Sequence, residues 1–272
     1  MKLECLRGKL QIAIGSAERI SGKNLTLPIL NSIILEAKNK VLIIRATNLE
    51  LGIEIELPCR VNQNGITAIP GGILFNFLSS INSEIIFLEV VAGNLIVSSI
   101  KHKTIIKGYS PVDFPTLPKI IDKQFSFNIP NDDLLNTLKT VSYSASNSLV
   151  KPEITSVCLY NHQNEVVAVA TDSFRLAEKV FLETLKIKLN LPYLIIPIKN
   201  TIEIIRVLET SAGEVLVEYN QHQISFKINN IYLTSRLVDG VYPDYRQIIP
   251  TTHLTQVVVL KADLQETLKL LN

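Results

Sequence analysis

An internal repeat is the feature that most limits how this chain can fold. Residues 28–36, Pro-Ile-Leu-Asn-Ser-Ile-Ile-Leu-Glu, are followed by a second apolar segment and by Ala-Thr-Asn-Leu-Glu-Leu at residues 46–51. About 125 residues later, Pro-Glu-Ile-Thr-Ser-Val-Cys-Leu-Tyr at residues 152–160 precedes another apolar segment and Ala-Thr-Asp-Ser-Phe-Arg-Leu at residues 170–176. Because the order and the spacing agree, the sequence predicts two copies of one folding unit.

Amphipathic helices are predicted at matching places in both copies. Each copy starts with a helix whose apolar residues recur every three or four positions, the period of a face that packs on a core. A second helix in each copy follows a proline, a residue favoured at helix starts. The predicted apolar stripes are Leu6, Leu10, Ile14 and Ala17; Ile73, Phe77 and Ile81 after Pro70; Leu134, Leu138, Val141 and Ala145; and Ile198, Ile202, Ile205 and Leu208 after Pro197.

The segments between these helices alternate apolar and polar residues, which is the period of a β-strand. Such strands are predicted to bury one face only. Each copy is therefore interpreted as an antiparallel sheet covered by two helices, and the predicted fold class is α+β. The clearest alternations are Leu51, Ile53, Ile55 and Leu57 against Gly52, Glu54 and Glu56, and Ile224, Phe226 and Ile228 against Ser225, Lys227 and Asn229.

The repeat divides the chain into predicted domains at residues 1–120, 121–250 and 251–272. In the last part, residues 257–260 are predicted to form a strand, and a helix with the stripe Leu264, Leu268 and Leu271 follows. An apolar helix face that has no sheet to cover is unfavourable. The sequence therefore predicts a third unit that is interrupted after its first helix, in a truncated chain.

Composition excludes several classes of protein. With 272 residues, 47% hydrophobic and 19% charged, the chain can bury a core, and disorder is excluded for most of it. Its apolar runs are shorter than the roughly 18 residues of a spanning helix, and the start lacks a secretory signal. The predicted location is the cytoplasm, without a membrane partner. A net charge of +2 does not by itself indicate a nucleic-acid partner.

No cofactor, metal site or catalytic centre is predicted. The three cysteines, Cys5, Cys59 and Cys158, are far apart in the sequence and are expected to be reduced, without a close redox or zinc pair. The four histidines are scattered as well. The sequence has no glycine-rich phosphate loop and no nucleophile elbow, so a non-catalytic protein is predicted.

Two sequence segments, in register with the repeats, resemble a known family. Residues 170–177, Ala-Thr-Asp-Ser-Phe-Arg-Leu-Ala, and residues 237–246, Leu-Val-Asp-Gly-Val-Tyr-Pro-Asp-Tyr-Arg, are similar to the bacterial DNA polymerase III β subunits, the sliding clamps. Residues 26–30 resemble the first domain of that family. The resemblance implies head-to-tail homodimers of three-domain chains that close into a ring around duplex DNA, with helices lining the hole. Such a ring needs phosphate contacts without base readout.

The resemblance implies a DNA-facing surface on the helices. Two departures from the family pattern predict weaker contact with duplex DNA: Gly71 and Gly72 replace a common basic pair, and Asn24 stands where an arginine often reaches DNA. Ordinary solvated helix faces remain an alternative interpretation for each cation. The residues expected to contact DNA are Arg7, Lys9, Arg19, Lys23, Asn24, Lys139, Ser148, Lys199 and Arg206.

The resemblance also implies a cleft that binds short peptides from the DNA polymerase III catalytic subunit, the clamp loader and other clamp-motif proteins. Apolar anchors beside a few polar groups are suited to peptide capture. Ser173-Phe174 replaces the usual glycine-histidine pair, and Gln247 replaces an arginine. Asp172 is interpreted as a turn residue that bonds its own backbone. The expected cleft residues are Ile154, Thr171, Ser173, Phe174, Arg175, Leu176, Pro243, Gln247 and Ile248.

One alternative function stays open at this point. An α+β scaffold could bind protein partners without encircling DNA, because the predicted basic lining is thin and the third domain is incomplete. For the 272-residue chain no closed ring is expected, since the third domain would supply one half of each dimer contact. The homodimer is expected of the full-length protein.

Overall fold

The computed structural model describes residues 1–22, 27–120, 122, 125–146, 148, 150–163, 165–181 and 191–271. The chain divides into two compact units, Met1–Tyr242 and Pro243–Asn272. Neither contains, among the described residues, a helix that is long and apolar enough to cross a membrane.

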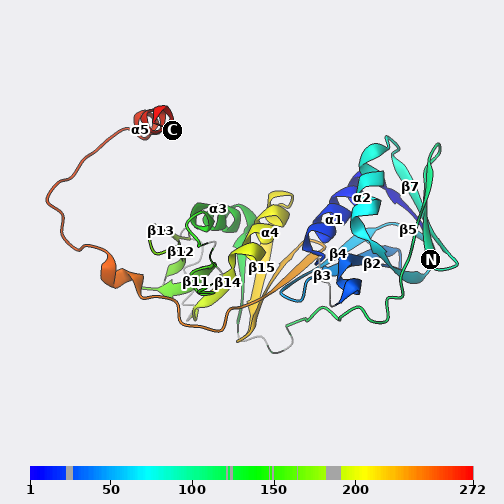
Figure 1. The fold of residues 1–272 in the computed structure, drawn as a ribbon, viewed down its shortest axis with the longest axis horizontal. Helices are drawn as coiled ribbons and strands as arrows, with labels where there is room; N and C mark the ends of the chain where they lie inside the picture. Colours follow the sequence, from blue (N-terminus) through cyan, green and yellow to red (C-terminus); the bar gives the residue numbers. More distant parts are fainter. Residues whose placement is uncertain are drawn as a thin grey trace. The chain divides into compact units, whose positions relative to one another are not determined.

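The first unit holds both predicted repeats (Figure 1). The elements of the first repeat are β1 (Lys2–Leu6), α1 (Arg7–Ile20), η1 (Pro28–Asn31), β2 (Ser32–Lys38), β3 (Val41–Thr47), β4 (Leu51–Pro58), β5 (Arg60–Gln63), β6 (Gly65–Pro70), α2 (Gly71–Ser80), β7 (Ile85–Val91), β8 (Asn94–Ser98) and β9 (Lys103–Ile106). Those of the second are β10 (Phe125–Pro130), α3 (Asn131–Ser142), β11 (Ser156–His162), β12 (Glu165–Thr171), β13 (Leu176–Val180), β14 (Leu194–Pro197), α4 (Ile198–Glu209), β15 (Glu214–Tyr219), β16 (Gln223–Ile228) and β17 (Ile231–Arg236).

The strands of the first unit form antiparallel sheets with the orders β5-β1-β7-β8-β9, β10-β15-β16-β17-β4-β3-β2-β6 and β13-β12-β11-β14. The α+β fold class is confirmed, but the prediction of one sheet for each copy is wrong. Each repeat divides its strands between two sheets, and β4 pairs with β17 to join the repeats into one eight-stranded sheet, with Ile53 opposite Leu233. The reason is that strand edges carry unpaired backbone groups, which the neighbouring repeat satisfies.

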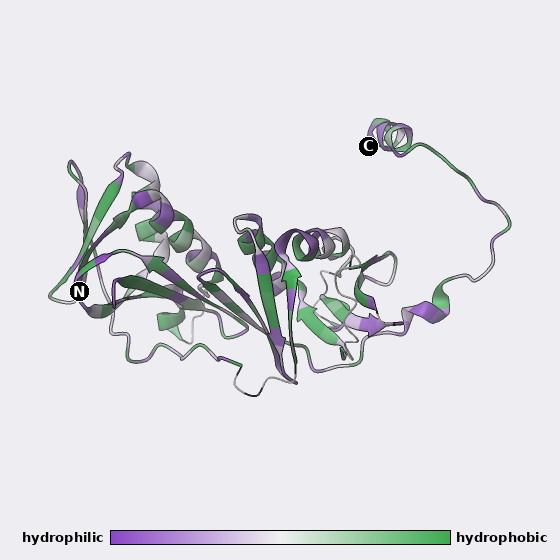
Figure 2. Cartoon of the chain, turned by 180° about the vertical axis from the view of Figure 1, so that it is seen from behind, coloured by the Kyte–Doolittle hydropathy of each residue, from purple (hydrophilic) through white to green (hydrophobic). Residues whose placement is uncertain are grey.

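Four helices form a row along the first unit. α1 contacts α2 and α4, and α4 contacts α3, which gives the order α2-α1-α4-α3 (Figure 1). α1 packs on β1 to β4, and α3 packs on β10 to β13, so each lies between the two sheets of its own repeat. Hydrophobic and hydrophilic residues alternate along these helices in Figure 2, as is typical of helices that cover a core on one side.

The predicted helix faces are only partly right. The stripe residues Leu134, Leu138 and Val141 of α3 are buried, as is Ala145 beyond its end, whereas Leu6 precedes α1 and is exposed. In α2 the buried residues are Gly71, Leu74 and Leu78, and Ile73 is exposed. This helix carries apolar residues nearly all round, so periodicity does not select a face and packing against α1 does. In α4, Ile202 is exposed, and Ile204 and Val207, which are outside the predicted stripe, are buried instead.

Strand β4 is buried on both faces, which contradicts the prediction that such strands bury one face only. Gly52 and Glu54, on the face predicted to be solvated, are buried. The segment that connects the two repeats crosses this face. A Cβ on Gly52 would lie 2.6 Å from Leu117 Cδ2, and Lys119 Nζ lies 3.0 Å from Glu54 Oε1. The connection therefore covers the sheet, and a larger residue at position 52 would displace the side chain of Leu117.

The second unit contains η3 (Tyr245–Ile248) and α5 (Lys261–Leu270). The helix predicted after residue 260 is confirmed. The strand predicted at residues 257–260 is wrong, because no partner strand adjoins this segment within the described residues. A strand needs such a partner for its backbone hydrogen bonds. No side chain of α5 is buried, including Leu264 and Leu268 of its apolar stripe.

Candidate functional site

Three of the six cations of the helix row pair with carboxylates of neighbouring or the same helices. Lys139 Nζ lies 2.7 Å from Glu209 Oε1, which joins α3 to α4. Arg19 Nε lies 3.4 Å from Glu203 Oε2, and Arg206 pairs with the same carboxylate. Glu203 thus links the two repeats through α1 and α4. These three predicted DNA-contacting cations are largely neutralised within the protein.

Arg7, at the start of α1, is held by uncharged groups of α1 and α2. Its Nη1 donates to Gln11 Oε1 at 2.6 Å and to the carbonyl of Leu78 at 3.2 Å. Leu78 belongs to the last turn of α2, where the helix dipole favours a positive charge. Lys9 and Lys199 are exposed and form no ion pair with another described residue. These two lysines are therefore the most available cations of the row.

Helix α2 adds no charge to this surface, because none of its residues is ionisable. A Cβ on Gly71 would lie 3.0 Å from Ile33 Cγ2 of β2 and 3.3 Å from Glu18 Cβ of α1, so the tight approach of both elements explains a glycine there. Glu18, which sequence reasoning missed, lies beside the start of α2. An acidic side chain is favoured at a helix N-terminus, and it further reduces the positive charge of the row.

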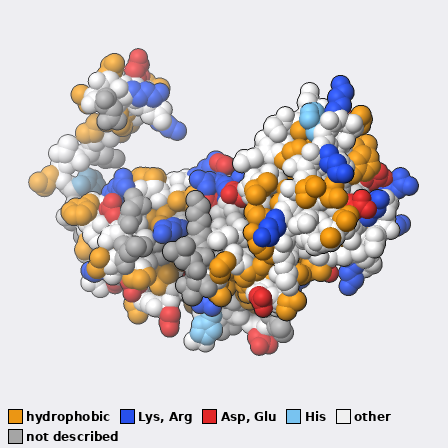
Figure 3. All heavy atoms as spheres, turned by 45° about the vertical axis from the view of Figure 1, so that its right-hand side comes forward, with side chains coloured by type: hydrophobic (Ala, Val, Ile, Leu, Met, Phe, Trp, Pro, Cys, Tyr) orange, Lys and Arg blue, Asp and Glu red, His pale blue; other side chains and the backbone are white. Residues whose placement is uncertain are grey.

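The remaining predicted DNA contacts are less informative. Lys23 and Asn24 lie outside the described residues. Ser148 is exposed in the turn after α3, where its amide donates to Ser146 Oγ at 3.0 Å. Basic and acidic side chains are scattered over the face seen in Figure 3, with no continuous basic surface. Helices α1 to α4 carry six cations and five anions, so the helix row is nearly neutral where the sequence predicted a thin basic lining.

The turn between β12 and β13 holds most of the predicted cleft residues. Asp172 Oδ1 accepts hydrogen bonds from the amides of Phe174 and Arg175 at 3.0 and 2.9 Å. Thr171 Oγ1 donates to the carbonyl of Arg175 at 2.8 Å, and it accepts from the amide of Ser173 at 3.2 Å. These bonds confirm the interpretation of Asp172 as a turn residue. Bonds from the amides of Arg175 and Phe174 are the main reason why the pKa of Asp172 is lowered.

The turn presents an apolar and a cationic side chain to solvent. Phe174 is 99% exposed, which is unusual for so large an apolar group. Arg175 Nε lies 2.9 Å from Asp172 Oδ2, and its guanidinium carbon lies 6.0 Å from the centre of the Tyr143 ring. Arg175 is therefore held beside the turn by an ion pair and an aromatic face, while Phe174 is unsupported within the first unit.

Strand pairing places Ile154 at the same end of the sheet as this turn. Cys158 lies opposite Val169 in the β11–β12 pair, so the start of β11 adjoins the end of β12. Ile154 precedes β11 by two residues and is partly buried, and its carbonyl accepts from the amide of Ser146 at 2.9 Å. Thr171 is buried and pairs with Leu176 across β12 and β13. The first unit therefore groups the six cleft residues predicted within it.

The other three predicted cleft residues belong to the second unit. Gln247 and Ile248 lie in the short helix η3, and Pro243 precedes it. Gln247 Nε2 donates to Asp244 Oδ2 at 2.7 Å, so the amide is oriented by its own turn.

Comparison with known proteins identifies the family. The N-terminal domain of the DNA polymerase III beta subunit matches residues 1–118, and the central domain of the same subunit matches residues 128–244. The chain belongs to the DNA polymerase III beta subunit family.

Curated relatives carry the name beta sliding clamp. The protein of Bacillus subtilis is 28% identical over 95% of this chain and 70% of its own length. That of Staphylococcus aureus is 26% identical over 84% of this chain, which corresponds to 62% of the relative. The chain thus spans between three fifths and three quarters of the length of these relatives.

Solved structures show the same fold. The beta subunit of Thermotoga maritima has a TM-score of 0.88 at 25% identity and covers 98% of this chain and 72% of its own. A sliding clamp from Pseudomonas aeruginosa, solved with griselimycin bound, has a TM-score of 0.84 at 23% identity, over 93% of this chain and 68% of its own. This second likeness concerns the fold alone.

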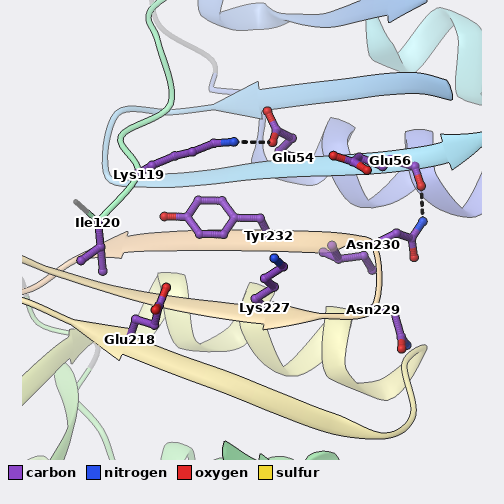
Figure 4. A pocket seen from close by; sticks show the side chains of 10 residues that line it. Glu54, Glu56, Lys119, Ile120, Glu218, Lys227, Asn229, Asn230 and Tyr232 are labelled. Atoms are coloured by element: carbon purple, nitrogen blue, oxygen red, sulfur yellow. Dashed lines mark hydrogen bonds and ion pairs between the residues drawn. The ribbon is translucent and has the colours of Figure 1, made fainter. Parts of the chain in front are cut away.

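One further cavity lies apart from both predicted sites of this beta-subunit chain. It has a volume of about 420 Å³ and lies on the eight-stranded sheet where β4 meets β17 (Figure 4). Lys119 spans it to Glu54, and the side-chain amide of Asn230 donates to the carbonyl of Glu56. Its lining mixes both signs of charge, and no cluster of metal-ligating side chains occurs among the described residues. The cavity marks the junction of the two repeats.

Proposed function

We propose that this chain is a DNA polymerase processivity factor, the subunit of a ring that encircles duplex DNA and tethers DNA polymerase III during replication. The observation that carries the proposal is the helix row α2-α1-α4-α3, which runs across both repeats along joined antiparallel sheets. A ring holds DNA by topology, so its inner surface needs only weak phosphate contacts. The proposed domains are residues 1–120, 121–250 and 251–272.

The charges of the helix row support sliding more than tight binding. Helices α1 to α4 carry six cations and five anions, and at least three of the cations pair with carboxylates. Because few phosphates would be neutralised, few counterions would be released, and binding without a closed ring would be weak and salt-sensitive. Sequence-independent contact with DNA follows, since phosphate contacts carry no base information.

The proposed partners are peptide segments of the DNA polymerase III catalytic subunit, the clamp loader and other clamp-motif proteins. The turn with Phe174 and Arg175 supports this proposal, because it offers a large exposed apolar group beside an oriented cation. Pro243, Gln247 and Ile248 would supply the remaining contacts. The chain would be non-catalytic and would act in the cytoplasm as a homodimer in its full-length form.

Retention on circular DNA tests the ring. The protein expressed from its complete gene, loaded onto nicked circular DNA, should stay bound through a high-salt wash and should leave when the circle is linearised. Electrostatic binding alone would be lost during the wash. Loss in high salt despite loading would instead favour the alternative function, a protein-interaction scaffold that does not encircle DNA, which the nearly neutral helix row also permits.

The unpaired lysines offer a second, matched test. Replacing Lys9 or Lys199 with alanine should reduce the salt slope of unloaded DNA binding by about one unit for each phosphate that the lysine neutralised. Lys139→Ala is the control, because Glu209 already neutralises that lysine. An equal reduction in all three variants would contradict the assignment of Lys9 and Lys199 as the available cations.

A further inference from the structure

Two of the three cysteines, which are 54 positions apart in the sequence, adjoin one another in the fold. Strand β1 pairs with β5 so that Leu3 lies opposite Val61 and Glu4 lies opposite Arg60. The next position along this antiparallel register sets Cys5 opposite Cys59. The expectation that the cysteines contain no close pair is therefore wrong for these two. Strand register, which the sequence alone does not reveal, brings them together.

Both cysteine side chains point to the same face of the sheet. Residues directly opposite one another in an antiparallel pair project to one side. Leu3 and Cys5 alternate with exposed or partly exposed residues of β1 and belong to the hydrophobic core, and Val61 and Cys59 pack against that core. Cys5 is buried and Cys59 is partly exposed, and both are free thiols. The two sulfur atoms thus occupy one side of the strand pair, the side that faces the core.

The backbone around Cys59 favours a disulfide between the two residues. Cys59 is the single residue between β4 and β5, at the corner where the chain leaves the eight-stranded sheet for the five-stranded sheet. The amide of Cys59 donates to the carbonyl of Lys40 at 3.0 Å and is therefore not bonded to Cys5. Cys5 and Cys59 thus form a non-hydrogen-bonded pair of the antiparallel ladder. Non-hydrogen-bonded pairs have Cα atoms about 4.5 Å apart, within the range that a disulfide spans.

We propose that Cys5 and Cys59 form an oxidisable dithiol, which a peroxide converts into a disulfide that links β1 to the β4–β5 corner. This inference goes beyond the proposed function and does not depend on DNA binding. Cys158 has no cysteine partner of this kind, because it lies in β11 of the four-stranded sheet, and it is fully buried.

The reaction balances with one molecule of hydrogen peroxide. Cys59 Sγ attacks a peroxide oxygen, the O–O bond breaks, and a sulfenic acid and one water form. Cys5 Sγ then attacks this sulfur, the S–S bond forms, and the S–O bond breaks with release of a second water. The two thiols lose two electrons and two protons, and peroxide is reduced to water. Cys59 reacts first because it is the more accessible of the two thiols. Burial raises the pKa of both thiols, and together with the neighbouring Cys59 it raises that of Cys5 to about 12.

The disulfide would join the two sheets of the first repeat. At present β1 belongs to the five-stranded sheet, and β4 belongs to the eight-stranded sheet. A covalent link between positions 5 and 59 closes a long loop, which restricts the unfolded chain more than the folded one. We expect the oxidised protein to have a Tm about 5–10 °C above that of the reduced protein.

Peptide mapping of the native chain tests the proposal directly. The protein is treated with hydrogen peroxide, remaining thiols are alkylated, and trypsin is added without a reductant. The expected product is the peptide of residues 3–7 linked to that of residues 46–60, which are the tryptic fragments containing Cys5 and Cys59. Addition of a reductant should separate them and restore both thiols. Recovery of both peptides unlinked, with Cys59 alkylated or oxidised to sulfinic acid, would overturn the proposal.

Matched variants separate the dithiol from general oxidation. Cys158→Ala should retain both the linked peptides and the rise in Tm. Cys59→Ala should lose both, while its reduced Tm stays near that of the native chain because the side chain is only partly buried. A peroxide-dependent rise in Tm that persists in Cys59→Ala would contradict the assignment, and so would cross-linking between separate chains in place of the internal link.

Discussion

The turn after β3 in the first repeat and the turn after β12 in the second have the same backbone but different surroundings. Asn48 Oδ1 accepts from the amides of Glu50 and Leu51, as Asp172 Oδ1 does from Phe174 and Arg175. The third residue of each turn, Leu49 and Ser173 respectively, has a φ of 76°. In both turns a threonine hydroxyl donates to the carbonyl four residues later. The same local side-chain hydrogen bonds therefore produce the same turn in both repeats.

The two turns differ in what covers them. In the first repeat the carbonyl of Glu50 accepts from the amide of Arg236 at 2.8 Å and from Asn200 Nδ2 at 3.3 Å. Both donors belong to the second repeat, so this turn forms part of the junction between repeats. At the position equivalent to Glu50, the second repeat has the exposed Phe174. The same turn is thus covered as a structural joint in one repeat and left exposed in the other.

The largest effect on stability is expected when a residue that follows the first turn is replaced by its counterpart after the second turn. Gly52 corresponds to Leu176 of the second turn, and Gly52→Leu would drive a side chain into Leu117 and Thr234. We expect the free energy of unfolding to fall by about 3 kcal/mol, since overpacking a filled core is costly. Urea denaturation measures the change. Gly8→Leu, at an open helical position, is the control and should be neutral or stabilising. If Gly52→Leu has the same free energy of unfolding as the native chain, the connecting segment does not pack tightly on β4.

Removing the side chain that fastens the first turn should have the next largest effect. Asn200 is buried and donates to both Glu50 and Ser235. Asn200→Ala removes the donor to the buried hydroxyl of Ser235 and one of the two bonds to the Glu50 carbonyl, which keeps the amide of Arg236. We expect a loss of about 2 kcal/mol in the free energy of unfolding. Asn136→Ala, on the exposed side of α3, is the matched control and should change stability by less than about 0.5 kcal/mol. Equal losses would mean that Asn200 does not fasten the joint.

Relieving the left-handed backbone should stabilise the second turn. Ser173 has a positive φ, which glycine adopts at little cost. We expect Ser173→Gly to raise the free energy of unfolding by about 0.5–1 kcal/mol. Thermal unfolding measures the gain. Ser173→Ala is the control, because alanine keeps the steric cost of a Cβ in this region, and a gain with alanine as well would point to another cause.

A small pH effect should distinguish the two turns. The pKa of Asp172 is lowered in the folded state, so the charged carboxylate stabilises the turn above its ordinary pKa of about 4. That contribution is lost as the pH falls through the lower folded pKa. Asp172→Asn keeps the acceptor and should remove this part of the acid sensitivity, whereas Asn48→Ala should leave the acid sensitivity of stability as it is. Stability curves between pH 2 and pH 6 that coincide for Asp172→Asn and the native chain would refute the assignment.

Phe174 should have almost no effect on stability. Because the ring is exposed, Phe174→Ala should change the free energy of unfolding by less than about 0.5 kcal/mol. The proposed function predicts that the same change weakens binding of a fluorescently labelled clamp-motif peptide, measured by polarisation. Ile100→Ala, another highly exposed apolar residue, is the control and should leave binding as it is. Equal affinity in the native and Phe174→Ala proteins would remove Phe174 from the peptide contacts.

Sequence patterns predicted elements best where local chemistry decides. The α3 stripe was predictable because Asp132, Asp133 and Lys139 mark its solvated side. The face of α2 was not predictable, since apolar residues surround this helix and contact with α1 selects Leu74 and Leu78. The cations of the candidate DNA surface were found, but their neutralisation by Glu203 and Glu209 depends on contacts between helices.

The sequence by itself determined the repeat, the helices and the turns, because each depends on neighbours within a few residues. Asn48 and Asp172 bend the chain through their own backbone wherever the turn is placed. Only the tertiary structure decided that β4 pairs with β17, that the first turn is covered, and that Cys5 faces Cys59. These outcomes depend on strand register and on surfaces brought together from distant positions. A strand edge pairs with whichever complementary edge the whole fold brings to it.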